Sequence, residues 1–312
     1  MKHRLAVGLG LGLGQTWSTR EEFASLVRAT EDTGWDSLWF SEHLTSATPA
    51  QFPQIAFAAA LTSRLRLGTS ITVVPGRSPV DLAKNLATLN SLAGGRLLPI
   101  LGLGIAEPSE HAAFGVTRLS RGTRLEQSLP LIRALTKGRT VEHRSAEFAL
   151  PGVGIGLTDP VPIVSFWLGG RSPGELARVG RLADGWLASF AAPAETAAGV
   201  ELVNRSARRA RRSVDDDHFG LLFPYARERH SVTVTRLLDD FHPGCDQATM
   251  APVGVDQLAR TFREHSASGI TKFILVPSEI HPGWYRELGA LREDVELALK
   301  DQRGRIYATS NH

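Results

Sequence analysis

The chain has 312 residues, of which 42% are hydrophobic and 21% are charged, and its formal net charge is +3. This composition is typical of a soluble globular protein with a full core, and no stretch is long and apolar enough to span a membrane. The single cysteine, Cys245, excludes an internal disulfide and a cysteine-rich metal site, and fits a cytoplasmic protein.

Short apolar segments alternate with helical patterns along the chain. We predict strands at residues 5–13, 37–41, 67–74, 97–103, 163–168, 185–189, 219–225 and 272–276. We predict helices at residues 20–33, 53–63, 79–92, 121–136, 173–182, 194–212, 256–267 and 284–300. Most of these strands are apolar on both faces, as expected for parallel strands covered by helices.

Eight strand–helix pairs predict a (β/α)₈ TIM barrel that forms a single domain over residues 1–312. A length of ~250 residues is typical of this fold, and insertions are common. A doubly wound open sheet is the main rival. Residues 141–160 and 241–255 lack clear periodicity, and we interpret both stretches as insertions that lie outside the barrel and carry substrate specificity.

The first predicted strand alternates glycine and leucine from residue 8 to residue 14. Successive side chains of a strand point to opposite faces, so one face of this strand is bare backbone. Inside a barrel, the bare face could leave room for a flat ligand. It could equally accommodate large neighbouring side chains, and this second interpretation is favoured on local grounds.

Ionisable residues follow the second strand at Glu42 and His43. Catalytic groups of a TIM barrel lie at the C-terminal ends of its strands, and histidine titrates near neutral pH. The pair could therefore move protons, with Glu42 orienting His43. A helix cap and a surface histidine are the alternative.

The third and fourth strands carry small polar residues and glycines near their ends. The hydroxyls of Thr69, Ser70 and Thr72 could bond a cofactor ring or only neighbouring backbone. Gly104 clears space at the end of the fourth strand, and Glu107 follows it. Glu107 could face a pocket, or could only favour the positive end of the next helix.

The fifth strand ends in Gly169 and Gly170, and a helix follows directly. Ser172 is its predicted N-cap, Pro173 its first residue, and Glu175 completes a capping box. Glycines allow an anion to approach the backbone, and a helix start presents free N–H groups. The segment therefore predicts an anion site, with an ordinary capped turn as the alternative.

Other catalytic and binding motifs are missing from the sequence. No histidine pair has metal-ligand spacing, so no metal site is predicted. Neither a P-loop nor a Gly-x-Ser-x-Gly nucleophile elbow is present. The arginines between residues 205 and 212 precede three aspartates and lack interleaved aromatic residues, which favours a solvated helix face over a nucleic-acid surface.

Taken together and in order, these segments resemble the bacterial luciferase-like superfamily of flavin- and deazaflavin-dependent oxidoreductases. The resemblance covers most of the chain and is clearest from residue 34 to residue 186. Its carriers are Gly-Trp-Asp-Ser-Leu-Trp-Phe-Ser-Glu-His at 34–43, Arg-Leu-Gly-Thr-Ser at 66–70, residues 77–89, Gly-Gly-Arg at 94–96, Gly-Leu-Gly at 102–104, residues 113–116 and 121–124, and Ala-Asp-Gly-Trp at 183–186.

The resemblance implies a TIM barrel that binds a ring cofactor. It places the cofactor phosphate at Gly169–Ser172, which includes Arg171, and the ring near strands one to four. It further implies ring contacts from Thr69, Ser70, Ile71 and Gly104, and a cis peptide bond at Ser70–Ile71 that backs the ring. Residues 82–89 are closer to the branch that uses the deazaflavin coenzyme F-420 than to the branch of FMN-dependent monooxygenases.

In the F-420 branch, an acidic residue and a histidine after the second strand work at the reacting centre, and Glu42 and His43 occupy that place. Some members also have a carboxylate directly after the glycines of the fourth strand. Here Ile105 and Ala106 intervene before Glu107, which is the next catalytic candidate.

The resemblance therefore implies an oxidoreductase that transfers a hydride between F-420 and a small organic substrate. The alternatives are an FMN-dependent monooxygenase that uses reduced flavin and oxygen, and a flavin-binding protein without catalysis. A small-molecule substrate is the expected partner, with neither nucleic acid nor membrane, and a homodimer is left open.

Overall fold

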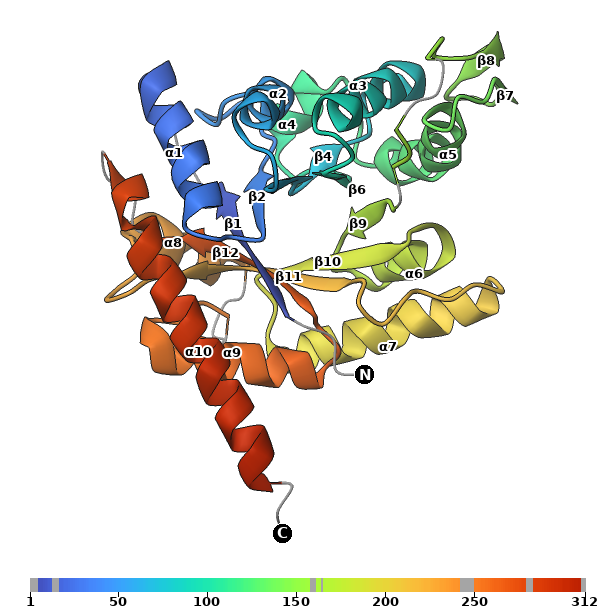
Figure 1. Cartoon of the computed structure of the whole chain (residues 1–312). Helices are drawn as coiled ribbons and strands as arrows, with labels where there is room; N and C mark the ends of the chain where they lie inside the picture. The colour runs from blue at the N-terminus through green and yellow to red at the C-terminus, as the bar shows by residue number, and fades with distance from the viewer. Residues whose placement is uncertain are drawn as a thin grey trace.

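Parallel strands form a ring, and helices surround it (Figure 1). This computed structural model describes residues 5–12, 17–157, 161–163, 165–241, 250–278 and 283–309, with side chains up to residue 300 except that of residue 241. The strands are β1 (Ala6–Leu11), β2 (Ser37–Phe40), β3 (Arg66–Thr69), β4 (Thr72–Val73), β5 (Leu97–Leu98), β6 (Ile100–Gly102), β7 (Val141–Arg144), β8 (Ala149–Val153), β9 (Trp167–Gly169), β10 (Gly185–Ser189), β11 (Phe219–Tyr225) and β12 (Lys272–Pro277). The helices are α1 (Arg20–Asp32), α2 (Gln51–Leu61), α3 (Pro79–Leu92), α4 (Pro108–Ala113), α5 (Ser120–Leu135), α6 (Pro173–Leu182), α7 (Pro193–Arg209), α8 (Val232–Phe241), α9 (Gly254–Ala267), the 3₁₀ helix η2 (Trp284–Glu287) and α10 (Leu288–Thr309).

The main sheet closes on itself. Its ten strands follow the order β4-β6-β9-β10-β11-β12-β1-β2-β3-β5, and every pair is parallel. β3 and β4 are two halves of one barrel strand, β5 and β6 are halves of the next, and β3 pairs with β5 as β4 does with β6. The ten strands therefore occupy the eight positions of the barrel, because β3 and β4 share one position and β5 and β6 share the next. The predicted (β/α)₈ barrel is confirmed, and the open doubly wound sheet is wrong.

A single side chain, that of Thr69, bridges the two strands at the point where both are broken. Pro99 interrupts the fourth strand, because proline has no N–H to donate to the ladder. The hydroxyl of Thr69 donates to the Ile100 carbonyl at 2.8 Å and accepts from the Ile100 N–H at 2.9 Å. Thr69 is fully buried, so this pair of hydrogen bonds replaces the missing ladder bond in the core.

The bare face of β1 is filled by side chains from its neighbours. A Cβ on Gly8 would lie 2.5 Å from the indole nitrogen of Trp39, and a Cβ on Gly68 would lie 2.1 Å from the same ring. A Cβ on Gly10 would come within 2.8 Å of Val276. The glycines of β1 therefore make room for Trp39 and Val276 in the barrel interior, and the interpretation that this face stays open for a cofactor ring is wrong for Gly8 and Gly10. Residues 13–16, which include the last glycine of the series, lie outside the described part of the chain.

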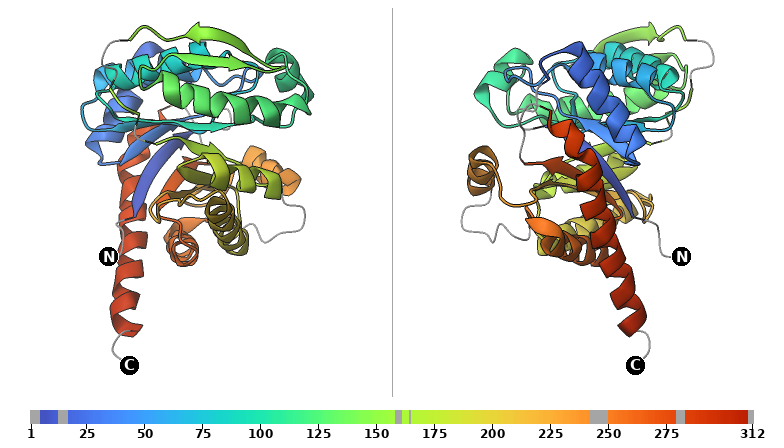
Figure 2. Two further views of the ribbon diagram at one scale, coloured as in Figure 1. Left: turned by 90° about the vertical axis from the view of Figure 1, so that its right-hand side faces the viewer. Right: turned by 60° about the vertical axis from the view of Figure 1, so that its left-hand side comes forward.

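The insertion between residues 141 and 160 contains an antiparallel hairpin, β7–β8, that the sequence analysis did not predict (Figure 2). Ser145 at its turn donates a hydrogen bond to Gln127 of α5 at 2.7 Å, and Glu147 pairs with Arg124 of α5 at 3.2 Å. These contacts anchor the hairpin to the barrel. In the second insertion, residues 242–249 lie outside the described part, and α8 precedes them.

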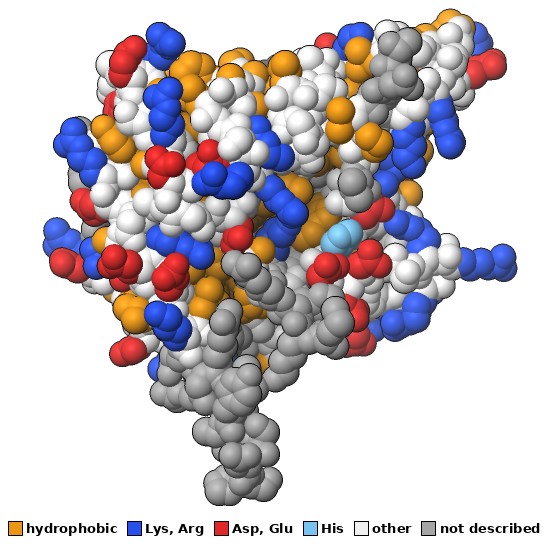
Figure 3. Space-filling model, viewed as in Figure 1, with side chains coloured by type: hydrophobic (Ala, Val, Ile, Leu, Met, Phe, Trp, Pro, Cys, Tyr) orange, Lys and Arg blue, Asp and Glu red, His pale blue; other side chains and the backbone are white. Residues whose placement is uncertain are grey.

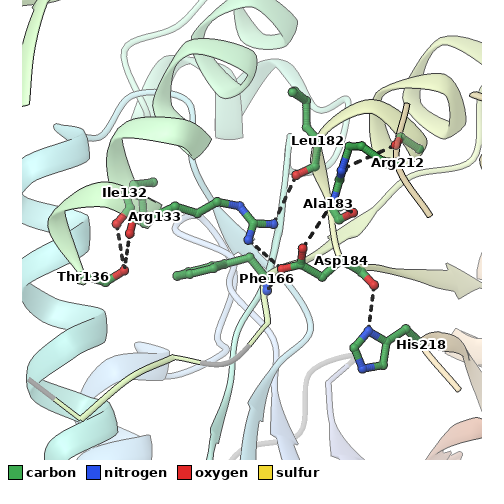
Figure 4. A network of polar contacts seen from close by, with 10 residues as sticks. Ile132, Arg133, Thr136, Phe166, Leu182, Ala183, Asp184, Arg212 and His218 are labelled. Atoms are coloured by element: carbon green, nitrogen blue, oxygen red, sulfur yellow. Dashed lines mark hydrogen bonds and ion pairs between the residues drawn. The ribbon is translucent and has the colours of Figure 1, made fainter. Parts of the chain in front are cut away.

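A polar network fixes the N-terminal edge of the barrel around Asp184 (Figure 4). The carboxylate of Asp184 accepts from Arg133 at 2.7 Å and from the Phe166 N–H at 2.8 Å, and it lies 3.4 Å from Arg212. The ring of His218 bonds the Asp184 carbonyl at 2.8 Å. The network therefore ties the segments before β9, β10 and β11 to α5, on the face of a TIM barrel that usually serves stability.

The surface shows no single dominant charge on the face in Figure 3, where positive and negative side chains are interspersed and hydrophobic atoms show in a hollow near the middle. Among the described helices, none combines the length and the apolar character that a membrane span requires.

Candidate active site

The C-terminal ends of neighbouring strands bring the predicted residues to one edge of the barrel. Glu42 and His43 follow β2, the Ser70–Ile71 bond separates β3 from β4, and Gly104 follows β6. Because β2 pairs with β3 and β4 pairs with β6, these residues are neighbours in space. The edge is the one where barrel enzymes carry their active sites.

The Ser70–Ile71 peptide bond is cis, as predicted. Gln51 at the start of α2 holds the bulge that follows, since it accepts from the Thr72 hydroxyl at 2.6 Å and donates to the Ile71 carbonyl at 3.2 Å. Gln51 is 1% exposed. Both ends of its amide are therefore used, and the bulge is fixed in one position by a buried side chain.

Glu42 holds the same bulge from the other side. Its carboxylate accepts from the Val73 N–H at 2.7 Å and from the Arg77 guanidinium at 2.5 Å. Burial raises the pKa of Glu42, although Arg77 and the Val73 N–H oppose the shift. No hydrogen bond joins Glu42 to His43 within the described residues, so this carboxylate positions the bulge and does not orient the histidine.

Arg77 is enclosed by aromatic rings. Its guanidinium lies 5.4 Å from the centre of the Phe52 ring and 5.8 Å from that of Phe114, and its Nε donates to the Val73 carbonyl at 3.1 Å. Cation–π contacts of this kind stabilise a guanidinium that has lost part of its water. Arg77 is thus a fixed part of the site that the sequence analysis missed.

His43 is half-buried, and its ring has no hydrogen-bond partner among the residues that the structure describes. Burial lowers the pKa of His43, with an opposing effect from the charge of Glu110. A lowered pKa leaves the imidazole neutral at pH 7, so the ring can accept a proton. His43 therefore has the exposure and the protonation state that a proton acceptor needs.

Glu110, which sequence analysis did not single out, fixes the loop after His43. Its carboxylate accepts from the Thr45 N–H at 2.7 Å, from the Thr45 hydroxyl at 2.6 Å and from the Leu44 N–H at 3.1 Å. Burial alone would raise the pKa of Glu110, but these hydrogen bonds outweigh it and hold the pKa below its usual value. Glu107, by contrast, is exposed at the start of α4 and caps no backbone group.

The predicted ring contacts divide into two kinds. The Ser70 hydroxyl is buried and has no hydrogen-bond partner in the described chain. The Ile71 side chain lies over the fourth and fifth strands, because a Cβ on Gly102 would be 2.1 Å from it and a Cβ on Gly169 would be 3.1 Å away. Gly104 has a φ of +78°, which favours glycine. The Thr69 hydroxyl is occupied by Ile100 and is not free for a ligand.

The anion loop after β9 is capped by its own carboxylate. Glu175 accepts from the Arg171 N–H at 3.0 Å and from the Ser172 N–H at 2.9 Å, and Ser172 caps α6 in return. Burial would raise the pKa of Glu175, but these hydrogen bonds outweigh it and lower the pKa. The capping box is confirmed. The N–H groups of Arg171 and Ser172 are therefore already bonded to Glu175 and are not free for a phosphate while the capping box is intact.

A cavity of about 270 Å³ lies beside this loop, between α6 and α7. Gly170, Arg171 and Glu195 are among its lining residues, and the Trp186 indole donates to the Gly170 carbonyl at 2.9 Å. Gly170 has a φ of +149°, and a Cβ there would lie 2.7 Å from Glu175. A side chain at residue 170 would therefore clash with Glu175, so the loop requires glycine at this position.

Comparison with known proteins decides the family. The sequence model described as luciferase-like monooxygenase matches residues 5–287. The chain belongs to the luciferase-like monooxygenase family. It is 32% identical over 178 residues to the F-420-dependent glucose-6-phosphate dehydrogenase of Nakamurella multipartita, covering 53% of this chain and 51% of that one. It is 26% identical over 195 residues to the 5,10-methylenetetrahydromethanopterin reductase of Archaeoglobus fulgidus, covering 62% and 57%. The match therefore spans little more than half the length of these relatives.

Solved structures of the family share the fold along almost the whole chain. An F-420-dependent secondary alcohol dehydrogenase in complex with an F-420–acetone adduct superposes with a TM-score of 0.77 at 17% identity, covering 95% of this chain and 99% of that one. The oxygenating constituent of 3,6-diketocamphane monooxygenase from Pseudomonas putida, in complex with FMN, superposes with a TM-score of 0.72 at 15% identity, covering 94% and 96%. At these identities the likeness shows the fold.

Proposed function

We propose that the protein is an F-420-dependent oxidoreductase that transfers a hydride between the deazaflavin ring and a small organic substrate. The observation that carries the proposal is the half-buried His43 ring, which lies without a partner at the same barrel edge as the unpartnered Ser70 hydroxyl. The similarity to an F-420-dependent glucose-6-phosphate dehydrogenase and to the structure of an F-420-dependent secondary alcohol dehydrogenase supports this cofactor over FMN.

The residues of this edge fit a flat ring cofactor. The buried Ser70 hydroxyl supplies one hydrogen bond that the protein itself leaves unmade. Ile71, held by the amide of Gln51, supplies an apolar surface against which a ring can pack. Glu42 and Arg77 hold the backbone behind that surface. The residues of the loop Gly169–Ser172 would hold the phosphate of the cofactor.

His43 would transfer the proton that accompanies the hydride. The bound deazaflavin supplies the hydride chemistry, and the protein supplies binding, orientation and acid–base catalysis. When an alcohol is oxidised, its hydroxyl proton passes to the neutral His43 ring. When a ketone is reduced, the protonated ring donates to the forming hydroxyl. Glu110 keeps the loop of His43 in place through Leu44 and Thr45.

Titration of the protein with F-420 and FMN side by side, followed by the fluorescence of each cofactor, tests the proposal. We expect micromolar binding of F-420 and none of FMN. Ser70→Ala should weaken F-420 binding by ~5-fold, the value of one ordinary hydrogen bond, while Ser91→Ala on the surface of α3 should not. Binding of FMN alone would favour the second candidate function, an FMN-dependent monooxygenase. This candidate is supported by the structural neighbour that was solved in complex with FMN. Binding of neither would overturn the cofactor site.

A further inference from the structure

A second cavity, of about 330 Å³, lies outside the proposed reacting centre, between the first turns of α1 and α2. These two helices are neighbours in the ring around the barrel (Figure 1). Trp17, Phe23 and Phe57 line the cavity, and Pro49, Ala50 and Pro53 complete its wall. Trp17 stacks on Phe23 with 4.9 Å between ring centres, and Phe23 stacks on Phe57 at 5.6 Å. The cavity is thus bordered by a continuous stack of aromatic rings.

The polar groups of this wall are satisfied by the protein itself. The Trp17 indole donates to the side-chain oxygen of Gln54 at 3.2 Å, and the amide nitrogen of Gln54 donates to the Pro49 carbonyl at 2.7 Å. An apolar cavity without free polar groups holds water poorly and gains free energy when an apolar ligand fills it. The body of a ligand for this cavity is therefore apolar, and a flat ring suits stacked walls.

One charge stands at the edge of the cavity. The guanidinium of Arg20 lies 5.9 Å from the centre of the Phe57 ring. Its ion pair is with the adjacent Glu21 at 3.9 Å, and the two side chains are 79% and 77% exposed. Such a pair contributes little, so Arg20 can exchange it for the anion of a ligand. The charge at the edge therefore selects a negative end group.

We propose that this cavity binds a small aromatic carboxylate, with the ring between the aromatic wall and the Pro49, Ala50 and Pro53 side and the carboxylate at Arg20. A volume of about 330 Å³ admits a single aromatic ring with a short side chain. A phenyl ring with a three-carbon acid chain is such a molecule. The proposal is independent of the cofactor and of the reaction at His43.

Calorimetric titration with 3-phenylpropanoate in the absence of any cofactor tests the proposal. We expect one molecule bound per chain with a Kd of ~1 mM or tighter. The neutral alcohol of the same skeleton should bind ~2–5-fold more weakly, the value of one exposed charge pair, and the matching amine more weakly still. Arg20→Gln should remove the difference between acid and alcohol. Arg28→Gln, an exposed arginine further along α1, should keep it.

Ala50→Trp fills the cavity and should weaken the binding of the acid by at least ~10-fold. Ala50 is exposed and precedes α2, so the larger side chain does not enter the barrel core. Failure of 3-phenylpropanoate to bind, equal binding of acid and alcohol, or unchanged binding to the folded Ala50→Trp variant would each overturn the proposal. Sedimentation of the same samples tests whether a second copy of the chain occupies the cavity instead. A dimer that binds the acid only after it dissociates would overturn the proposal, because the second copy would then fill the site.

Discussion

The pair formed by Glu42 and Arg77 offers a direct test of how the active-site edge is built. In Arg77→Met, the Glu42 carboxylate keeps only the hydrogen bond from the Val73 N–H. The side chain of Glu42 is 6% exposed and that of Arg77 is 22% exposed. Removal of one partner from a buried pair costs ~3–5 kcal/mol, because the other charge stays buried without compensation. Since Arg77 is partly solvated, we expect a loss near the lower end, ~3 kcal/mol of unfolding free energy at pH 7.

The sign of the pH dependence follows from the pKa of Glu42. Burial raises this pKa above its unfolded value even with Arg77 present, and removal of the guanidinium raises it further. A group with a raised pKa in the folded state stabilises the fold below its unfolded pKa, and this stability is lost as the pH rises through the folded pKa. The deficit of Arg77→Met should therefore be smaller at pH 5 than at pH 7.

Urea unfolding of the variant at both pH values measures these differences. The double variant Glu42→Gln with Arg77→Met removes the stranded charge, so it should recover much of the stability that Arg77→Met loses at pH 7. A loss below ~1 kcal/mol for Arg77→Met, or a double variant no more stable than Arg77→Met, would refute the buried ion pair as the element that holds the bulge.

Two further predictions concern groups with lowered pKa values. His43→Ala should lower turnover by ~10²–10⁴-fold with the cofactor still bound. In the unchanged protein, kcat for substrate oxidation should fall as the pH drops through the lowered pKa of His43, because the protonated ring cannot accept a proton. A variant with near-normal turnover would remove His43 from the mechanism. Lys272 at the start of β12 has its pKa lowered to about 8 by burial and by Arg66. Its charge therefore opposes folding below pH 8, and this cost is relieved as the pH rises from 8 toward the unfolded pKa of 10.5. Lys272→Met should raise the unfolding free energy at pH 7 by up to ~3 kcal/mol in urea titrations, whereas Lys137→Met, at an exposed position, should not.

Regular segments of the barrel were predictable from the sequence. β10, β11, α3 and α6 have the predicted bounds, because apolar runs and caps such as Ser78 and Ser172 determine them locally. The short α4 and the hairpin β7–β8 were not predicted. Neither has a strong periodicity, and the hairpin depends on contacts with α5 that are distant in sequence.

The site was predictable in position but not in detail. His43 and Glu42 lie at the strand end where the sequence placed them, because strand ends are local features. The partners of Glu42 come from residues about thirty positions later, with separations of 31 to Val73 and 35 to Arg77. Gln51 precedes the predicted helix and carries no local signal, and only the fold brings its amide to the bulge. The roles of Glu42 and Gln51 therefore depend on contacts between segments that are distant in sequence, and the sequence alone did not predict them.

The loop after β9 holds the clearest conflict between the proposed function and the observed contacts. The Arg171 and Ser172 N–H groups bond Glu175 at 3.0 and 2.9 Å, and these are two of the backbone donors that the loop could offer to a phosphate. A carboxylate and a phosphate cannot share them without repulsion, so cofactor binding here requires Glu175 to leave its place in the capping box. Substitution of Gly170 would not test this cleanly, because its φ of +149° and the nearby Glu175 strain any side chain there.

Glu175→Ala tests the conflict directly. Loss of the Glu175 carboxylate should cost the free protein ~0.5–2 kcal/mol of unfolding free energy, since the Arg171 and Ser172 N–H groups lose their acceptor, although the Ser172 hydroxyl still caps the N–H of residue 175. The two freed N–H groups should then bind the cofactor phosphate ~10-fold more tightly in a fluorescence titration, because no carboxylate competes for them. Glu201→Ala on the exposed face of α7 is the matched control and should change neither quantity. If Glu175→Ala instead weakens cofactor binding, Glu175 shapes the loop and does not compete with the phosphate. The phosphate must then be held by groups other than the Arg171 and Ser172 N–H groups.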